Sequence, residues 1–190
     1  MVQYTVNYFD LRSIGESVRL LLTYVGADFK DFRVNGETWE SYKPNAPTGK
    51  LPNIHFEGKI LSETGAILRY LARKYNLIGA DEWEAAKADE VYDHYRQLAD
   101  IIRKYTEFFT PNRDIVFKYL TDVLTKSKSG FVVDSGVTWA DFFIVENVTT
   151  LLNVDPEGAK TFPAVAAYQK RVYNLSQIKN YVATRKFSKF

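Results

Sequence analysis

The 190-residue sequence contains no cysteine, and this absence excludes several classes of chemistry. Disulfide cross-links and metal sites built on thiolates are excluded. Also excluded is every redox or nucleophilic reaction that needs a thiol supplied by the protein, because the thiolate is the reacting form. If the protein takes part in thiol chemistry, the sulfur therefore belongs to its substrate.

The sequence also has few histidines, a small net charge and no long apolar run. The histidines, His55 and His94, are too few to predict a metal site. The 25 basic and 23 acidic side chains leave a net charge of +2, which is too balanced to predict a nucleic-acid partner. No apolar run reaches the roughly 18 residues of a membrane-spanning helix. The N-terminal segment lacks the basic start of a secretory signal, so we expect a cytoplasmic protein with no membrane partner.

Hydrophobic residues make up 46% of the chain, which is enough for a sizeable core. Alternating apolar residues over positions 2–8 predict a strand, and apolar residues at helical spacing predict a helix over Ser13–Tyr24. A second short strand is predicted at Phe29–Val34. Because a helix joins these two strands, we expect them to be parallel, with a right-handed crossover.

The next segment predicts a hairpin and another helix. A helical turn at Thr38–Tyr42 precedes predicted strands at Pro52–Phe56 and Lys59–Leu61, and a helix follows over Glu63–Tyr75. The whole order is βαβ, a connecting turn, then ββα. This order predicts an α/β thioredoxin-like domain over residues 1–76, with a four-stranded mixed sheet and helices on its faces.

The remainder, residues 81–190, is predicted to be an all-helical domain. Thr138 and Asp141 have the spacing of a capping box, which predicts the start of a buried helix. A helix break is predicted at Thr110–Asn112, where proline interrupts the pattern. Short helices are predicted at Pro163–Tyr173 and Ser176–Thr184. The basic segment Lys179–Phe190 is predicted to be a solvated tail.

The segment Gly49–Tyr75 carries the strongest functional signal. Leu51-Pro52 precedes a strand and a hairpin, which makes it a candidate for a cis peptide bond. The following helix is expected to start near Glu63-Thr64, where a hydroxyl and free backbone N–H groups form a site for a carboxylate. The segment therefore predicts a site for a small acidic peptide beside a helix N-terminus.

This segment, together with Tyr8-Phe9, the Thr138–Asp141 box and the C-terminal sequence, resembles the glutathione transferases. The nearest pattern is the sigma-like class, particularly its nematode members, and the resemblance covers nearly the whole chain. It implies an enzyme that conjugates glutathione, as a substrate and without a metal, to small hydrophobic electrophiles. It also implies a homodimer.

The resemblance assigns roles to individual residues. Tyr8 would stabilise the glutathione thiolate; Tyr4 lies on the same face of the strand, so spacing alone does not separate the two. The implied glutathione ligands are Tyr8, Trp39, Lys43, Lys50, Leu51, Pro52, Glu63 and Thr64. The expected electrophile pocket comprises Phe9, Ile14, Tyr105 and Phe108, with the C-terminal Phe190.

Several positions depart from the sigma pattern. Arg12-Ser13-Ile14-Gly15-Glu16 stands where that class usually has Arg-Gly-Arg-Ala-Glu, so that Ile14 replaces an arginine. Lys50 replaces a glutamine, and Glu63-Thr64 replaces Gln-Ser. Gln97 replaces an aspartate that reaches the ligand across the dimer, and the segment over residues 108–115 is shortened. We expect glutathione binding to persist and turnover to be reduced.

These departures leave two alternatives to an active enzyme. One is a non-catalytic ligandin that binds glutathione and carries haem or other apolar anions. The other is a structural or interaction module that retains only the transferase fold.

Overall fold

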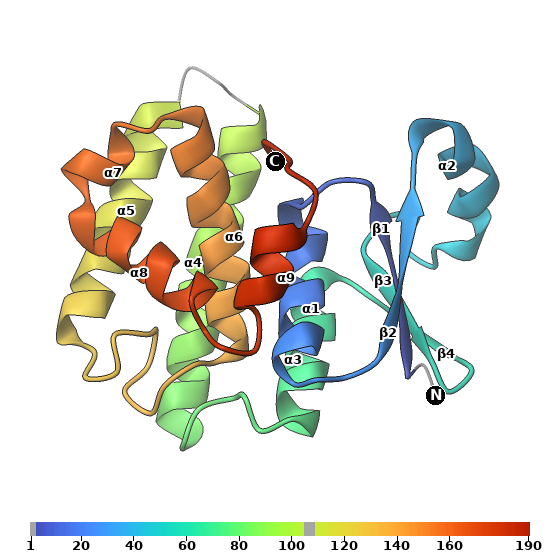
Figure 1. Cartoon of the computed structure of the whole chain (residues 1–190), viewed down its shortest axis with the longest axis horizontal. Helices are drawn as coiled ribbons and strands as arrows, with labels where there is room; N and C mark the ends of the chain where they lie inside the picture. The colour runs from blue at the N-terminus through green and yellow to red at the C-terminus, as the bar shows by residue number, and fades with distance from the viewer. Residues whose placement is uncertain (1–2, 105–108) are drawn as a thin grey trace.

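The computed structural model describes residues 3–104 and 109–190 (Figure 1), and the side chains of 98–104 and 109–111 lie outside that description. The sheet has four strands, β1 (Tyr4–Phe9), β2 (Phe29–Val34), β3 (Asn53–Phe56) and β4 (Lys59–Ser62), in the order β2-β1-β3-β4. β1 and β2 are parallel, whereas β3 is antiparallel to both β1 and β4. The predicted mixed sheet and its parallel β1–β2 pair are confirmed.

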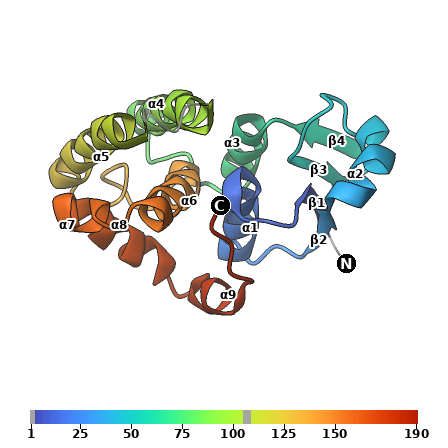
Figure 2. The same ribbon diagram turned by 90° about the horizontal axis from the view of Figure 1, so that it is seen from above.

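Helices cover both faces of this sheet. Figure 2 shows α1 (Ser13–Tyr24) and α3 (Thr64–Lys74) between the sheet and the helical half of the molecule. The short α2 (Gly36–Tyr42) lies beyond the opposite face and is followed by a 3-10 turn, η1 (Lys43–Asn45). Burial is complete along one side of α1, because Val18, Leu21 and their neighbours pack between the sheet and α6.

The helical half contains six helices in the described residues. They are α4 (Glu82–Lys104), α5 (Phe109–Lys126), α6 (Trp139–Val154), α7 (Gly158–Thr161), α8 (Pro163–Tyr173) and α9 (Lys179–Thr184). α6 is buried on nearly every side and begins at the predicted capping box: the backbone N–H of Thr138 donates to the Asp141 carboxylate at 2.8 Å. Burial is the main influence on Asp141 and raises its pKa to about 6, although three further donors reach the same carboxylate.

Two local predictions were wrong. Thr110–Asn112 does not break the helix but lies within the first turn of α5. Proline is tolerated there because backbone N–H groups in the first turn of a helix have no intrahelical partner. The last helix begins at Lys179 rather than Ser176, since residues 176–178 form a turn.

The basic C-terminal segment is not a solvated tail, which corrects that prediction. It returns along α1, as Figure 1 shows near the C-terminus. The Arg185 guanidinium donates to Glu16 at 3.0 Å and to Glu146 at 2.8 Å. The backbone N–H of Arg12 donates to the carbonyl of Phe190 at 3.1 Å. This segment therefore joins the sheet-bearing half to the helical half.

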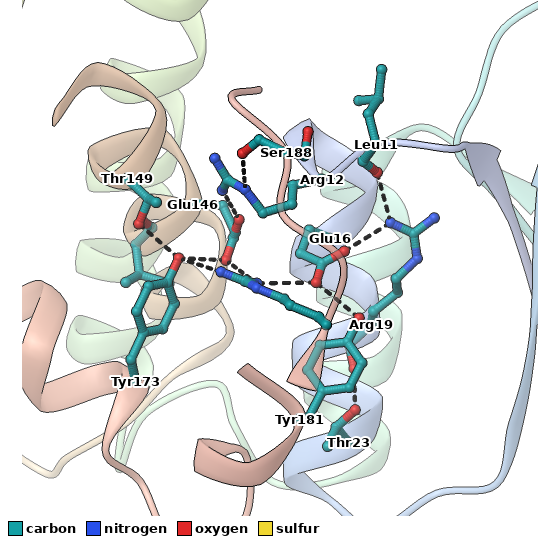
Figure 3. A network of polar contacts seen from close by, with 12 residues as sticks. Leu11, Arg12, Glu16, Arg19, Thr23, Glu146, Thr149, Tyr173, Tyr181 and Ser188 are labelled. Carbon is teal, nitrogen blue, oxygen red and sulfur yellow. Dashed lines mark hydrogen bonds and ion pairs between the residues drawn. The ribbon is translucent and has the colours of Figure 1, made fainter. Parts of the chain in front are cut away.

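A buried polar network around Glu16 and Glu146 (Figure 3) also includes Arg185. Glu16 on α1 also accepts hydrogen bonds from Arg19 and Tyr181, each at 2.8 Å. Glu146 on α6 accepts from Tyr173 and pairs with Arg12. Burial opposes ionisation of Glu16, but the Arg19 and Arg185 charges outweigh it and lower the pKa of this carboxyl. The network holds α1 against α6, next to the candidate site.

Candidate active site

A cavity of about 430 Å³ opens at the carboxyl end of β1, beside the first turns of α1 and α3. It brings together most of the residues expected to bind the peptide. Its lining includes, from that set, Tyr8, Trp39, Lys50, Leu51, Pro52, Glu63 and Thr64, joined by Phe9 and Ile14. Lys43 is exposed on η1 and does not line this cavity, so the structure does not bring it together with the others.

Tyr8 occupies the centre of the site. It is 5% exposed at the end of β1, and its ring lies 5.7 Å from the Phe9 ring and 5.7 Å from the Arg19 guanidinium carbon. A Cβ built on Gly15 would lie 2.2 Å from two ring atoms of Tyr8, so the ring sits directly on the first turn of α1. Tyr4, in contrast, is packed in the core, where its hydroxyl lies 3.2 Å from that of Tyr75. Tertiary structure thus separates the two tyrosines.

The segment before α3 has an unusual backbone. The Leu51–Pro52 bond is cis, as predicted. Glu63, which precedes α3, has a φ of 70°, a left-handed value that costs a non-glycine residue on the order of 1–3 kcal/mol. Such outliers cluster at functional sites, and here the outlier aims the first turn of α3 into the cavity. Thr64 is buried at the first position of that helix.

Trp39 is held over the cavity by aromatic packing. Its ring centroid lies 5.3 Å from that of Phe9 and 6.5 Å from that of Tyr42. Lys50, also on the cavity wall, is exposed, and its ammonium provides positive charge at that end. A hydrogen-bond donor and a cation beside an apolar wall suit a peptide with a terminal carboxylate.

A second cavity, of about 390 Å³, adjoins the first. Tyr8 and Ile14 line both cavities. Among the residues expected in an electrophile pocket, Phe190 also lines the second cavity, whereas Phe9 lines only the first. Tyr105 and Phe108 lie outside the described residues. Sequence reasoning missed several of the second cavity's walls, among them Leu11, Tyr95, Val116, Asn147 and Leu151.

Sequence reasoning also missed Tyr92 and Arg96, which extend from α4 into the first cavity. Tyr92 lies on the apolar side of this long helix and Arg96 on its polar side. Such positions are ordinary for a helix and did not indicate ligand binding in the sequence. Gln97, at the position of the expected aspartate, is exposed and lines neither of these two cavities.

Comparison with known proteins adds to this geometry. The N-terminal domain of the glutathione S-transferases matches residues 4–73, and their C-terminal domain matches residues 84–185. Glutathione S-transferase 4 of Caenorhabditis elegans is 34% identical, with 99% of each chain covered. The chain belongs to the glutathione S-transferase family. It is therefore a transferase, and glutathione is its thiol substrate.

Solved structures of nematode enzymes have the same fold. A Nu-class glutathione S-transferase from Haemonchus contortus superposes with a TM-score of 0.91 at 31% identity, over the full length of both chains. A glutathione S-transferase of the hookworm Necator americanus, described as monomeric, gives a TM-score of 0.92 at 29% identity over the same span. Among residues 3–104 and 109–190, no helix is long and apolar enough to cross a membrane.

Proposed function

We propose that this glutathione transferase binds glutathione in the first cavity and a small hydrophobic electrophile in the second, with the Tyr8 hydroxyl stabilising the thiolate between them. The observation that carries this proposal is that Tyr8 lines both cavities. A sulfur bound next to this residue would face the second cavity, where the electrophile would be attacked. The products are the thioether and the displaced leaving group, or the adduct when the electrophile is an activated alkene.

The energy required matches what one tyrosine supplies. A free thiol has a pKa of about 8.5, so only about 3% is thiolate at pH 7. Lowering this pKa by about two units raises the thiolate fraction to roughly three quarters and requires about 2.7 kcal/mol. One hydrogen bond to a charged acceptor contributes roughly 1.5–3 kcal/mol, and a helix N-terminus adds about 0.3–1 kcal/mol. Tyr8 and the first turn of α1 are sufficient together.

The rest of the peptide is assigned to the walls of the first cavity. Thr64 and the N-terminus of α3 would bind the γ-glutamyl carboxylate, and Glu63 its ammonium group. The backbone of Leu51, before cis-Pro52, would pair with the cysteinyl part. Trp39 and a lysine would bind the terminal carboxylate; Lys50, which lines the cavity, is better situated than Lys43.

Turnover is proposed to be lower than in enzymes with the full sigma pattern. Ile14 lines both cavities at the position where that class carries an arginine. An apolar side chain offers no charge to the thiolate but enlarges the apolar surface that a hydrophobic electrophile can contact. We assign the chain to a sigma-like class on the motifs from Tyr8 to Thr64.

A homodimer in the cytoplasm completes the proposal. Exposed apolar residues on the edge strand β4 and at the start of α4, Ile60 and Trp83, support an interface between two copies. Analytical ultracentrifugation tests this: a mass twice the 21.9 kDa of one chain is expected, and a single-chain mass would contradict it. Cell fractionation tests the compartment.

Tyr8→Phe tests the catalytic assignment. The variant keeps the ring and loses only the hydroxyl, so glutathione affinity should stay within a few-fold while turnover with a generic aryl halide falls by about tenfold or more. The thiol pKa of bound glutathione, followed by ultraviolet absorbance of the thiolate, should rise by one to two units, by the energies given above. Near-normal turnover in Tyr8→Phe would refute the mechanism.

A ligandin remains a second candidate because Ile14 makes the second cavity largely apolar at its junction with the first. Retention on a glutathione column followed by the same conjugation assay separates the possibilities. Retention with turnover supports the enzyme, and retention without turnover supports a carrier of haem or similar apolar anions. No retention indicates a structural module.

A further inference from the structure

One tyrosine of the helical half lines the first cavity, and the proposed function gives it no role. Tyr92, on α4, lines the first cavity although it is only 4% exposed. Its ring centroid lies 5.0 Å from that of Trp139 and 4.5 Å from that of Phe143. The Arg69 guanidinium lies over the same ring, 4.9 Å from its centroid. Packing from α6 and α3 therefore holds the ring in one position.

The Tyr92 hydroxyl is directed at the N-terminus of α3. A Cβ built on Gly65 would lie only 2.7 Å from this oxygen, so the absence of a side chain at Gly65 permits the approach. Within the described part of the chain, no other residue forms a hydrogen bond with the Tyr92 hydroxyl. The packed ring thus holds the phenol at the cavity wall, where its oxygen can donate to a bound ligand with little further loss of side-chain freedom.

We propose that the Tyr92 hydroxyl donates a hydrogen bond to the α-carboxylate of the γ-glutamyl group, so that the helical half of the same chain is part of the peptide site. This inference rests on the proposed binding of glutathione in the first cavity. It makes Tyr92 a ligand-binding residue, whereas Tyr8 acts on the sulfur.

Three features of the environment of Tyr92 favour a carboxylate over an ammonium as the partner of its hydroxyl. Burial is the main cause of a raised pKa at Tyr92, so the phenol remains a protonated donor at neutral pH. The N-terminus of α3, next to Gly65, carries a partial positive charge. Arg96, one turn further along α4, adds a guanidinium to the same cavity wall. The ammonium of the ligand is left to Glu63.

The position of Tyr92 also bears on Gln97, which stands where the sigma pattern has an aspartate that reaches the ligand across the dimer. Gln97 is exposed and lines neither this cavity nor its neighbour, so it has no contact with a peptide bound within this chain. A phenol and a guanidinium from α4 of the same chain supply an anchor for the γ-glutamyl end. The site therefore gains contacts that do not depend on a second copy of the protein.

Tyr92→Phe tests this inference because it keeps the packed ring and removes only the oxygen. Calorimetric titration of the full-length variant with glutathione should show affinity weaker by about tenfold, the effect of one hydrogen bond to a charged group. The matched control is Tyr70→Phe, on α3, which removes a phenolic oxygen that lines neither cavity. This control should bind glutathione like the wild type.

A modified ligand identifies the atom that is bound. Wild type and Tyr92→Phe should bind γ-aminobutyryl-cysteinyl-glycine, which lacks only the α-carboxylate, with equal affinity.

The outcomes separate this inference from the proposed function. Glutathione binding by the wild type with unchanged affinity in Tyr92→Phe would overturn the inference alone. An equal loss for both ligands would also overturn it, because it would show that the hydroxyl acts on the fold and not on the carboxylate. Absence of glutathione binding to the wild type would overturn the proposed function itself, and the inference with it.

Discussion

Arg185 offers the sharpest test of how the two halves of the molecule are held together. Its side chain is 9% exposed and lies between Glu16 and Glu146, each 1% exposed. The surrounding network balances three guanidiniums, those of Arg12, Arg19 and Arg185, against the carboxylates of Glu16, Glu146 and Asp31. Arg185→Met keeps the apolar stem but leaves one negative charge uncompensated in a buried position.

The magnitude follows from this environment. Removing one partner of a buried ion pair costs about 3–5 kcal/mol. Because Arg19 still pairs with Glu16, and Arg12 with Glu146, the lower end of that range applies to Arg185→Met. For a chain of this length, about 3 kcal/mol corresponds to a melting temperature lower by roughly 6–12 °C.

Urea unfolding at pH 7, followed by circular dichroism, measures this loss. Lys186→Met is the matched control, because Lys186 is the neighbouring cation but is 74% exposed, and its pair with Asp10 is a surface pair. Such a pair contributes less than about 1 kcal/mol. If Arg185→Met were no less stable than Lys186→Met, the network would not hold the halves together as argued here.

The same variant has a pH signature. Because the charges of Arg19 and Arg185 lower the pKa of Glu16 in the folded protein, the stability from these pairs is present above the ordinary glutamate pKa, about 4.3. It is lost as the pH falls through the lower folded pKa. The difference between wild type and Arg185→Met should therefore shrink in acid, and a difference that grew in acid would contradict the assignment.

Two further predictions concern the active site. Gly15→Leu would place a side chain larger than the alanine of the sigma pattern where a Cβ alone lies 2.2 Å from the Tyr8 ring, so the ring must move. Turnover should fall by about 10²-fold, with the pH profile shifted toward a higher thiol pKa and glutathione affinity little changed; an unshifted profile with normal turnover would contradict the seating of Tyr8 on α1. Ile14→Arg should raise turnover in the aryl halide assay by adding a cation beside the thiolate. A drop in turnover would mean that the site is built around the isoleucine.

Much of the fold was predictable because its signals are local. Alternation in Tyr4–Phe9, helical spacing in Ser13–Tyr24 and the capping pair Thr138 and Asp141 each depend on residues close in sequence. The parallel pairing of β1 with β2 followed from the helix that joins them. Helix boundaries failed where local signals are ambiguous, as at Pro111, which proline chemistry permits either before a helix or in its first turn.

The candidate site was predictable in part. The segment from Leu51 to Thr64 is nearly continuous in sequence, so its cis-proline, hairpin and helix start could be recognised together. Tyr92 could not be recognised, because its proposed role depends on α4 packing beside α3 and on the missing side chain at Gly65. Arg185 looked like part of a solvated tail because its carboxylate partners lie 39 and 169 residues away.

The sequence by itself determined the kind of chemistry: without cysteine the reactive sulfur has to come from the substrate, and the residues of the candidate peptide site from Leu51 to Thr64 lie close together in the sequence. Only the tertiary structure decided which tyrosine faces the cavities. Tyr4 and Tyr8 share one face of β1, yet Tyr4 is covered by the core while Tyr8 reaches the strand end where two cavities adjoin. Burial and cavity shape arise from segments that meet only on folding, so no local pattern encodes them.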